Sequence, residues 1–320
     1  MPATGYDEMP GMVAIPGVGI GTVTHRELGT GVTVILLPEG AVGGVDIGGG
    51  APATRETPLL DPKNVVAGPD AIVLCGGSAL GLQAADGVAL ALWQQNRGLA
   101  VGNIRIPIVV AAAIFDLDFG QAVPPTPNDG RAALKAAEEM YQHLPEGSYG
   151  AGTGATVGKS LGKDYAMKGG QGAVTLRTPD GLHVSAVVVV NAVGSIVSET
   201  GTIVAGPRLP DGTPVDTTAL WSAAPTPLFP GGATTIGAVI TDARLSKAEL
   251  ARICRMAHDG LARAIDPAHT PWDGDTIFAT SVGSVQASAA RVGALAARAF
   301  AIAARRAVSL AGSEPSRPLA

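Results

Sequence analysis

Glycine is spread through the apolar segments of this sequence, and that pattern limits what the chain can fold into. The 320 residues include 44 glycines and 24 prolines, about twice the average use of glycine. Glycine gathered in polar tracts is typical of disorder. Here it interrupts hydrophobic runs instead, and 46% of all residues are hydrophobic. The sequence therefore predicts a closely packed fold in which glycines mark turns and close contacts.

Charge and run length exclude two classes of partner. The chain has 22 Lys and Arg against 27 Asp and Glu, a net charge of -5, so no basic field is available for a nucleic acid or an anionic membrane. The apolar runs at residues 106–115 and 185–190 are shorter than the roughly 18 residues of a membrane span. Residues 1–12 do not have the pattern of a secretory signal. We expect a cytoplasmic protein without nucleic acid or membrane partners.

The residue types that usually hold metals or cofactors form no known pattern. Cys75 and Cys254 stand in apolar contexts without C-x-x-C spacing, and both are expected to be buried thiols. The histidines show neither metal-ligand spacing nor a neighbouring nucleophile, and each is expected to be structural or solvent-facing: His25, His143, His183, His258 and His269. No metal and no cofactor is therefore expected.

Two glycine-rich segments approach nucleotide-binding motifs without matching them. Residues 150–160 have Thr153 where a phosphate-binding loop needs glycine, and no buried strand precedes them. Residues 17–21 lack the G-x-G-x-x-G form. We interpret residues 150–160 as a loop whose backbone passes close to another group, which leaves Lys159 without a role.

Hydrophobic patterns predict a mixed α/β chain. Strands or buried runs are predicted at residues 32–37, 71–74, 106–114, 173–177, 182–191, 234–241 and 276–280. Helices are predicted at residues 77–93, 130–144 and 284–307, and after a capping box at Ser246.

Three segments are not expected to form regular elements. Residues 200–232, rich in Pro and Gly, are predicted to be a long exposed connection, and the ends at 1–12 and 312–320 are expected to be mobile. No period of 20 to 50 residues repeats, which excludes a solenoid. A length of 320 residues suits one large domain or two modest ones.

An N-terminal nucleophile is the chemistry that remains without metals, cofactors or histidine-based signatures. A terminal Thr or Ser carries its own base, the free α-amine, whose pKa of about 8 suits proton abstraction at neutral pH. Self-cleavage must expose such a residue, where a Gly- and Pro-rich segment meets a strand. Gly231, Gly232 and Ala233 before Thr234 form such a junction. The alternative is that Thr234 only begins a strand as a good β-former.

Asp273 and Asp275 flank Gly274 and form a close acidic pair. On an extended backbone, side chains at i and i+2 leave on one face, so the two charges repel and one pKa rises unless a cation sits between them. The ammonium group of a new terminal Thr234 would be such a cation. An exposed acidic turn or a calcium-like motif is the alternative.

Four segments in order, residues 150–159, 187–194, 234–242 and 273–276, together resemble the DmpA-type aminopeptidase family. That family includes β-peptidyl aminopeptidases and nylon hydrolases that cut 6-aminohexanoate oligomers. The resemblance implies an αββα sandwich of the DmpA/ornithine acetyltransferase type. It also implies self-cleavage into an α chain of residues 1–233 and a β chain of residues 234–320, folded as one unit and assembled as a homotetramer.

Matched motif by motif, the resemblance assigns a role to each candidate residue. Thr234 would be the nucleophile, and Asn191 would stabilise the oxyanion. Lys159 would lie near the nucleophile and either lower the pKa of its amine by like charge or orient it. Asp273 and Asp275 would order the nucleophile and its ammonium group.

Two positions depart from the family pattern. Ala233 stands where the family usually has Gly or Asn, which bears on the rate of self-cleavage. Phe115 stands where some members carry Tyr, so a hydroxyl donor is missing there.

A Thr nucleophile with paired Asp residues resembles the nylon-hydrolase branch. The resemblance therefore implies an amidohydrolase for linear ω-amino-acid oligomers of the 6-aminohexanoate type or for short peptides. One alternative is an aminopeptidase acting on peptides, amino-acid amides or β-peptides. Another is an acyltransferase of the ornithine acetyltransferase kind, and a third is a non-catalytic scaffold in which Thr234 stays internal.

Overall fold

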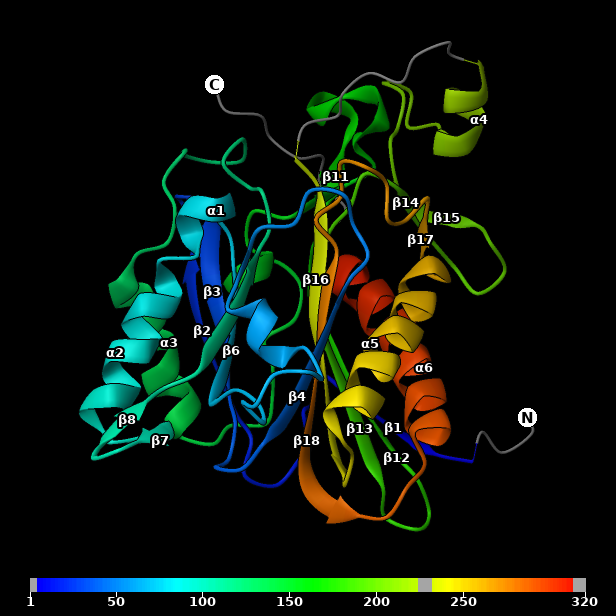
Figure 1. Ribbon diagram of the computed structural model, residues 1–320. Coiled ribbons are helices and arrows are strands. Elements are labelled where there is room, and N and C mark those ends of the chain that lie inside the picture. Colours follow the sequence, from blue (N-terminus) through cyan, green and yellow to red (C-terminus); the bar gives the residue numbers. More distant parts are fainter. Residues whose placement is uncertain (1–4, 224–231, 313–320) are drawn as a thin grey trace.

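The computed structural model describes residues 5–223 and 232–312, which form four layers in the order helix, sheet, sheet, helix (Figure 1). The first sheet contains, in spatial order, β1 (Asp7–Pro10), β12 (Gly170–Arg177), β13 (His183–Asn191), β16 (Thr234–Ala243), β18 (Thr276–Val285) and β4 (Val42–Ile47). The second contains β2 (Gly19–His25), β3 (Thr30–Leu36), β6 (Ala71–Cys75), β9 (Val109–Ala113) and β5 (Thr54–Arg55).

Helices cover the outer face of each sheet. The first sheet packs against α5 (Lys247–Ala262) and α6 (Ala289–Ser309), and the second packs against α2 (Ala84–Gln94) and α3 (Pro127–Glu138). This is the predicted αββα sandwich. The smaller elements are α1 (Ser78–Gly81), α4 (Thr217–Ala223), β7 (Leu99–Val101), β8 (Ile104–Ile106), β10 (Thr156–Val157), β11 (Met167–Lys168), β14 (Ser195–Val197), β15 (Ile203–Ala205) and β17 (Ile265–Asp266). Short 3-10 turns lie at Thr57–Leu60, Gly150–Gly152, Lys159–Leu161 and Lys163–Tyr165.

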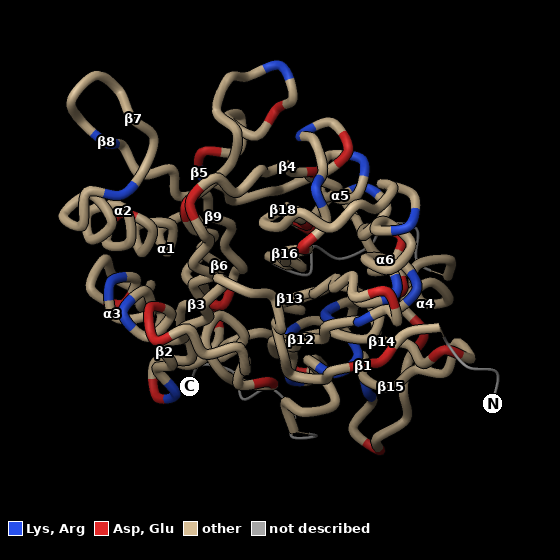
Figure 2. The backbone as a smooth tube through the Cα atoms, turned by 90° about the horizontal axis from the view of Figure 1, so that it is seen from below, with Lys and Arg blue, Asp and Glu red and all other residues tan. Residues whose placement is uncertain are grey.

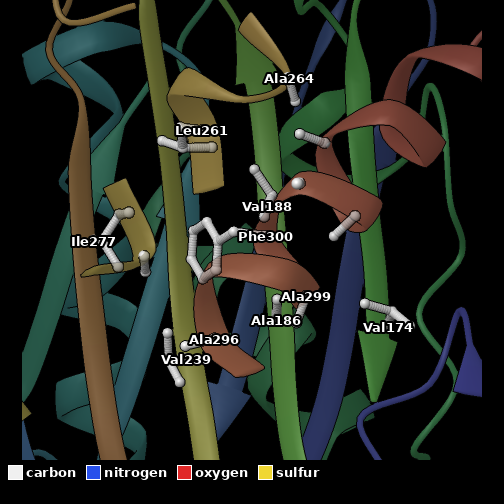
Figure 3. Close-up of a cluster of buried hydrophobic side chains, with 14 of the residues drawn as sticks. Val174, Ala186, Val188, Val239, Leu261, Ala264, Ile277, Ala296, Ala299 and Phe300 are labelled. Carbon is white, nitrogen blue, oxygen red and sulfur yellow. The ribbon is translucent and has the colours of Figure 1, made fainter. Parts of the chain in front are cut away.

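Strand alternation divides the core into layers. On β13, Val188 belongs to the cluster beneath α5 and α6, whereas Val187 and Val189 belong to the cluster between the two sheets. Figure 3 shows Val188 with Phe300 of α6 lying against β13 and β16. Because both faces of these strands are buried, the strands read as nearly continuous apolar runs in the sequence.

Glycines let the layers approach closely. A Cβ on Gly21 of β2 would lie 2.0 Å from the carbonyl oxygen of Ala133 in α3, so only glycine allows this helix its position. A Cβ on Gly152 would lie 2.3 Å from the amide nitrogen of Gln171. The glycine-rich segment 150–160 thus passes close to neighbouring backbone, as predicted, although it includes β10 and 3-10 turns as well as loop.

Several predicted elements are confirmed. Strands β12 and β13 pair antiparallel as a hairpin, with Arg177 opposite His183. Ser246 caps α5, and a reciprocal bond from its backbone to Glu249 completes the capping box. Both Cys75 and Cys254 are buried free thiols. Among the described residues, no helix has the length and apolar character needed to cross a membrane.

Three predicted helices differ in their bounds from those in the structure. The helix predicted at residues 130–144 ends at Glu138, because Met140 takes a left-handed backbone conformation with φ of 56°. The helix predicted from residue 284 begins at Ala289, because β18 extends to Val285, which pairs beside Ala243. The helix predicted at residues 77–93 is divided into α1 and α2 by a tight turn.

Two segments are more ordered than predicted. Residues 7–10 form β1, an edge strand that pairs with β12, because pairing with a sheet edge satisfies their backbone groups. The predicted exposed connection 200–232 contains β15 and α4. Residues 224–231 of this connection lie outside the described residues, as do residues 313–320 of the tail predicted to be mobile at 312–320.

Charged residues lie mainly on the outer layers. In Figure 2, Lys and Arg alternate with Asp and Glu along the helices and loops, and the strands of the two facing sheets carry few of them. The buried charged groups described below are therefore exceptions that need a local explanation.

Candidate active site

The predicted catalytic residues meet at one end of the first sheet, where β13 ends and β16 begins. Asn191, the last residue of β13, pairs with Thr234, the first residue of β16. Strand β18 runs parallel to β16, and a backbone bridge joins Ala233 to Asp273. All five candidates are almost fully buried, with exposed fractions of 4% for Thr234, 3% for Lys159, 2% for Asp275, 1% for Asp273 and 0% for Asn191. In the uncut chain they form a closed site.

The hydroxyl of Thr234 lies against the peptide bond that self-cleavage would break. Thr234 Oγ1 donates to the carbonyl oxygen of Ala233 at 2.5 Å. The backbone N–H of Gly274 donates to the same oxygen at 2.9 Å. Two donors therefore polarise this carbonyl, and both are aimed at the oxygen on which negative charge would develop if the carbonyl were attacked.

Gly274 is a site residue whose role was not predicted. Its N–H contacts Ala233 because β16 and β18 are parallel neighbours. A Cβ at this position would lie 2.8 Å from Thr234 Oγ1 and 2.6 Å from the carbonyl oxygen of Ala51. In the sequence, this donor could be suspected only from the glycine between two aspartates. Almost any residue type has a backbone N–H, so residue type does not reveal a backbone donor.

Lys159 links three parts of the site. Its Nζ donates to Asn191 Oδ1 at 2.7 Å, to the Asn191 carbonyl at 3.2 Å and to the Gly232 carbonyl at 3.0 Å. Burial lowers the pKa of Lys159 to about 8, although the carboxylate of Asp118 opposes this shift. Apart from the family resemblance, the sequence suggests no role for this lysine. In the structure its ammonium group binds the carbonyl of Gly232, the residue before Ala233.

Asn191 is held by both ends of its amide. Its Oδ1 accepts from Lys159 and from the backbone N–H of Thr156 at 2.9 Å, and its Nδ2 donates to the Phe115 carbonyl at 2.9 Å. In the uncut chain the Asn191 amide thus donates to Phe115, whereas the Ala233 carbonyl accepts from Gly274 and Thr234. The oxyanion role of Asn191 stays a prediction.

Each carboxylate of the acidic pair fixes a different backbone segment. Asp275 Oδ1 accepts from the N–H of Thr235 at 2.5 Å, so it holds the residue directly after the nucleophile. Asp273 Oδ2 accepts from the N–H and hydroxyl of Thr270, at 2.9 and 2.6 Å. Burial, followed by the charge of Asp275, raises the pKa of Asp273 to about 6. One pKa of the pair is thus raised, as expected for neighbouring carboxylates.

His269 was predicted to be structural or solvent-facing, and the structure brings it to the acidic pair. Its Nδ1 lies 2.7 Å from Asp275 Oδ2, and its ring centroid lies 4.6 Å from that of His258. Burial lowers the pKa of His269, but the hydrogen bond and charge of Asp275 outweigh burial, and the net shift is upward. Among the described residues, no group of three or more His, Cys, Asp or Glu is placed to hold a metal ion.

Known proteins are similar to this sequence over most of its length. The chain matches peptidase family S58 over residues 12–311. An uncharacterised aminopeptidase of Mycobacterium leprae is 44% identical over 270 residues, which cover 81% of this chain and 72% of that protein. A 6-aminohexanoate-oligomer endohydrolase of Paenarthrobacter ureafaciens is 36% identical over 280 residues, which cover 84% of this chain and 74% of that enzyme.

Solved structures share the fold. The L-aminopeptidase D-Ala-esterase/amidase of Ochrobactrum anthropi, a variant of the Ntn hydrolase fold, superposes with a TM-score of 0.69 at 21% identity, covering 96% of this chain and 88% of that one. A Burkholderia β-aminopeptidase superposes with a TM-score of 0.67 at 20% identity, covering 94% and 88%. The predicted fold and the predicted family resemblance are both confirmed. This chain is therefore a member of peptidase family S58 and an amide-bond hydrolase.

Proposed function

We propose that the protein is a self-cleaving threonine amidohydrolase that cuts its own Ala233–Thr234 bond and then uses Thr234 as an N-terminal nucleophile. The observation that carries this proposal is the contact of Thr234 Oγ1 with the Ala233 carbonyl, which also accepts the Gly274 N–H. The products would be an α chain of residues 1–233 and a β chain of residues 234–320.

Self-cleavage begins with an N-to-O acyl shift. Thr234 Oγ1 bonds to the carbonyl carbon of Ala233, the peptide C–N bond breaks, and the hydroxyl proton ends on the nitrogen of Thr234. Gly274 N–H stabilises the charge on the carbonyl oxygen during attack. Water then hydrolyses the ester, which leaves a carboxylate on Ala233 and a free hydroxyl and amine on Thr234.

In turnover the new amine acts as the base. It takes the hydroxyl proton while Oγ1 attacks the substrate amide, and it passes this proton to the leaving nitrogen. Water releases the acyl group and returns a proton to Oγ1. Lys159, which donates to the Gly232 carbonyl, would favour the neutral form of this amine through like charge. Asp275 would keep the adjacent Thr235 in position through the Thr235 N–H.

The substrates proposed are linear ω-amino-acid oligomers of the 6-aminohexanoate type or short peptides. The relatives, an oligomer endohydrolase and an aminopeptidase, support both kinds of activity. The aminopeptidase alternative would act on peptides, amino-acid amides or β-peptides. An acyltransferase of the ornithine acetyltransferase kind would transfer the same acyl group to an added amine in preference to water. We also propose a cytoplasmic homotetramer of processed units.

The first test is the intact mass of the purified protein, with N-terminal sequencing of any fragment. We expect a fragment of about 9 kDa, as residues 234–320 of a 31.9 kDa chain, that begins Thr-Thr-Ile-Gly. A single 31.9 kDa species after prolonged incubation would contradict the proposal.

A further inference from the structure

In the uncut chain, the segment that ends at Ala233 lies in the site as the acyl part of the Ala233–Thr234 peptide bond. In the ester that follows the N-to-O shift, the carbonyl carbon of Ala233 is bonded to Oγ1 of Thr234, and the Thr234 amine is free. An acyl-enzyme formed from a substrate has the same linkage, with the substrate's acyl group in place of the chain that ends at Ala233. If the proposed function holds, the residues before Thr234 therefore mark where the acyl side of a substrate lies.

Two donors hold this acyl segment. The carbonyl of Ala233 accepts the N–H of Gly274 at 2.9 Å. The carbonyl one residue earlier, on Gly232, accepts from Lys159 Nζ at 3.0 Å. The site thus contacts two successive carbonyl groups of a peptide.

The contact with Gly232 uses the last donor of Lys159. An ammonium group has three N–H donors and no acceptor. Asn191 accepts two of them, at Oδ1 and at its backbone carbonyl, and Gly232 accepts the third. Lys159 is 3% exposed, so few water molecules can replace this partner, and a buried donor left without an acceptor is costly.

The shape of the site limits the side chains on the acyl segment. Ala233 is 1% exposed. A Cβ on Gly232 would lie 2.5 Å from Cγ of Phe115, so this position takes a glycine or an acyl group without a branch. The ring of Phe115, which stands where some relatives of the family carry Tyr, therefore acts as a wall of the acyl side.

We propose that Lys159 and Phe115 form an acyl-side subsite for an N-acylated small residue, in which Lys159 binds the carbonyl one residue before the cleaved bond. The substrate class is an internal amide bond that follows an alanine-sized α-aminoacyl unit acylated by a small group. A free α-ammonium at this unit would occupy the position of the Ala233 nitrogen, the bonded neighbour of the Gly232 carbonyl carbon. It would then face the ammonium of Lys159 in a buried site, where like charges repel strongly.

This subsite ranks the candidate substrates. It favours cleavage within N-acylated peptides over removal of a free N-terminal α-amino acid. In a 6-aminohexanoate oligomer the next carbonyl lies farther along the methylene chain, so it does not coincide with the Gly232 carbonyl. Such oligomers would therefore bind without this contact.

Three substrates separate the two effects of Lys159. We would measure kcat/KM of the processed wild-type protein for the 4-nitroanilides of N-acetylalanine, alanine and propanoic acid. The propanoyl compound has neither an upstream carbonyl nor an ammonium group. We expect the N-acetylalanyl substrate to be at least about tenfold better than the propanoyl one, as for a hydrogen bond to a charged group. We expect the alanyl substrate to be poorer than the propanoyl one.

A substitution assigns both differences to the lysine. In Lys159→Met the ratio of the N-acetylalanyl to the propanoyl substrate should fall, and the ratio of the alanyl to the propanoyl substrate should rise, each to within about twofold of one. This holds whatever the loss of overall rate, because each ratio cancels effects that the substrates share. If this variant fails to process, the same comparison is made by calorimetric binding of N-acetylalanine, alanine and propionate to the processed wild-type protein. N-acetylalanine should then bind at least about tenfold more tightly than propionate.

The outcomes distinguish this inference from the proposed function. If kcat/KM for the alanyl substrate equals or exceeds that for the propanoyl substrate, the subsite is overturned and the proposed amidohydrolase activity still stands. A processed protein that binds N-acetylalanine preferentially but hydrolyses none of the three nitroanilides keeps the subsite and contradicts the amidohydrolase. A chain that never cleaves itself overturns both.

Discussion

At the scale of single residues, two adjacent residues of the same type can make quite different contacts in the site. Thr234 and Thr235 are both buried threonines at the start of β16, yet only the first contacts a carbonyl that can be cleaved. Among the described residues, the hydroxyl of Thr235 has no hydrogen-bond partner. Residue type alone therefore does not separate the two threonines, whereas their positions relative to Ala233 and Gly274 do, and these positions support Thr234 as the proposed nucleophile.

Replacing the hydroxyl of Thr234 should stop both reactions. In Thr234→Ala we expect no self-cleavage and no hydrolysis, because one oxygen serves both, while Thr234→Ser should retain both. Thr235→Val is the matched control and should process normally. Intact mass over time measures the outcome, and hydrolysis retained by Thr234→Ala would exclude this residue as the nucleophile.

His269 should act as a positioning residue through its bond to Asp275. We expect His269→Leu to slow self-cleavage by about ten- to a hundredfold, since loss of precise placement near a reacting group has effects of this size. His269→Asn, whose amide can donate from nearly the position of Nδ1, should stay within about threefold of wild type.

The control for His269 is a second His–Asp pair at the far end of β16. His183 Nδ1 lies 2.7 Å from Asp242 Oδ2, the same distance as in the His269 pair. His183→Leu removes a similar bond far from Thr234, so its cleavage half-time should not change. Equal slowing in both Leu variants, or no rescue by Asn, would indicate a merely structural role.

The raised pKa of Asp273 predicts a pH-dependent difference in stability. Its pKa is about 6 in the folded protein against an ordinary value of 3.8, so between these values the folded state binds more protons and loses stability as pH rises. Asp273→Asn should therefore gain stability relative to wild type from about pH 4 to pH 6.

Denaturant unfolding at several pH values checks this slope. The comparison variant is Asp180→Asn. The hydrogen bond from Arg291 lowers the pKa of Asp180 below its ordinary value of 3.8, so this group affects stability mainly below about pH 4, and the stability of Asp180→Asn relative to wild type should change little from about pH 4 to pH 6. A difference between wild type and Asp273→Asn that stays constant with pH would contradict the shift.

At the scale of secondary-structure elements, local signals predicted the pieces and missed some of their ends. The capping box at Ser246 and the turn between β12 and β13 lie within a few residues of the elements they define. The end of α3 is different, since the residues after Glu138 leave the helix to bond with distant backbone: Leu144 N–H donates to the Gly11 carbonyl. A tertiary contact of this kind has no local pattern.

Close packing of helix on sheet should make Gly21 intolerant of a methyl group. Since a Cβ there would lie 2.0 Å from the Ala133 carbonyl, Gly21→Ala must shift α3 and should destabilise the protein by about 1–3 kcal/mol, as overpacking does. Thr22→Ala, at the next position on the same strand, should cost less. Equal midpoints in urea unfolding for Gly21→Ala and wild type would contradict this packing.

At the scale of the whole molecule, the four layers bring distant segments to one end of the sheet and leave an apolar hairpin at the surface. Strands β7 and β8 pair with Leu99 opposite Ile106 and Val101 opposite Ile104, so these four side chains share one face. All four are exposed, from 44% for Leu99 to 57% for Val101 and Ile104. Exposed apolar faces of this kind are typical of contacts between subunits.

The proposed homotetramer should use this hairpin. We expect the double variant Val101→Glu, Ile104→Lys to lower the mass in solution measured by light scattering, while opposite charges across the strand pair preserve the hairpin. Val204→Glu is the control, because Val204 is 41% exposed and its strand β15 lies across the molecule from β7 and β8 in Figure 1 and Figure 2. An unchanged mass for the double variant would place any subunit interface elsewhere.

The sequence by itself determined the buried strands and most of the site's residue types, and it implied the four layers only through the family resemblance. Continuous apolar runs predicted strands buried on both faces, and the acidic pair, the glycine-rich junction and Thr234 could each be found from short segments. Only the tertiary structure decided which groups touch. The donor from Gly274, the position of His269 and the third partner of Lys159 all depend on the pairing of β16 with β13 and β18. Pairing between distant segments is set by the packing of the whole core, and no local stretch of sequence contains that information.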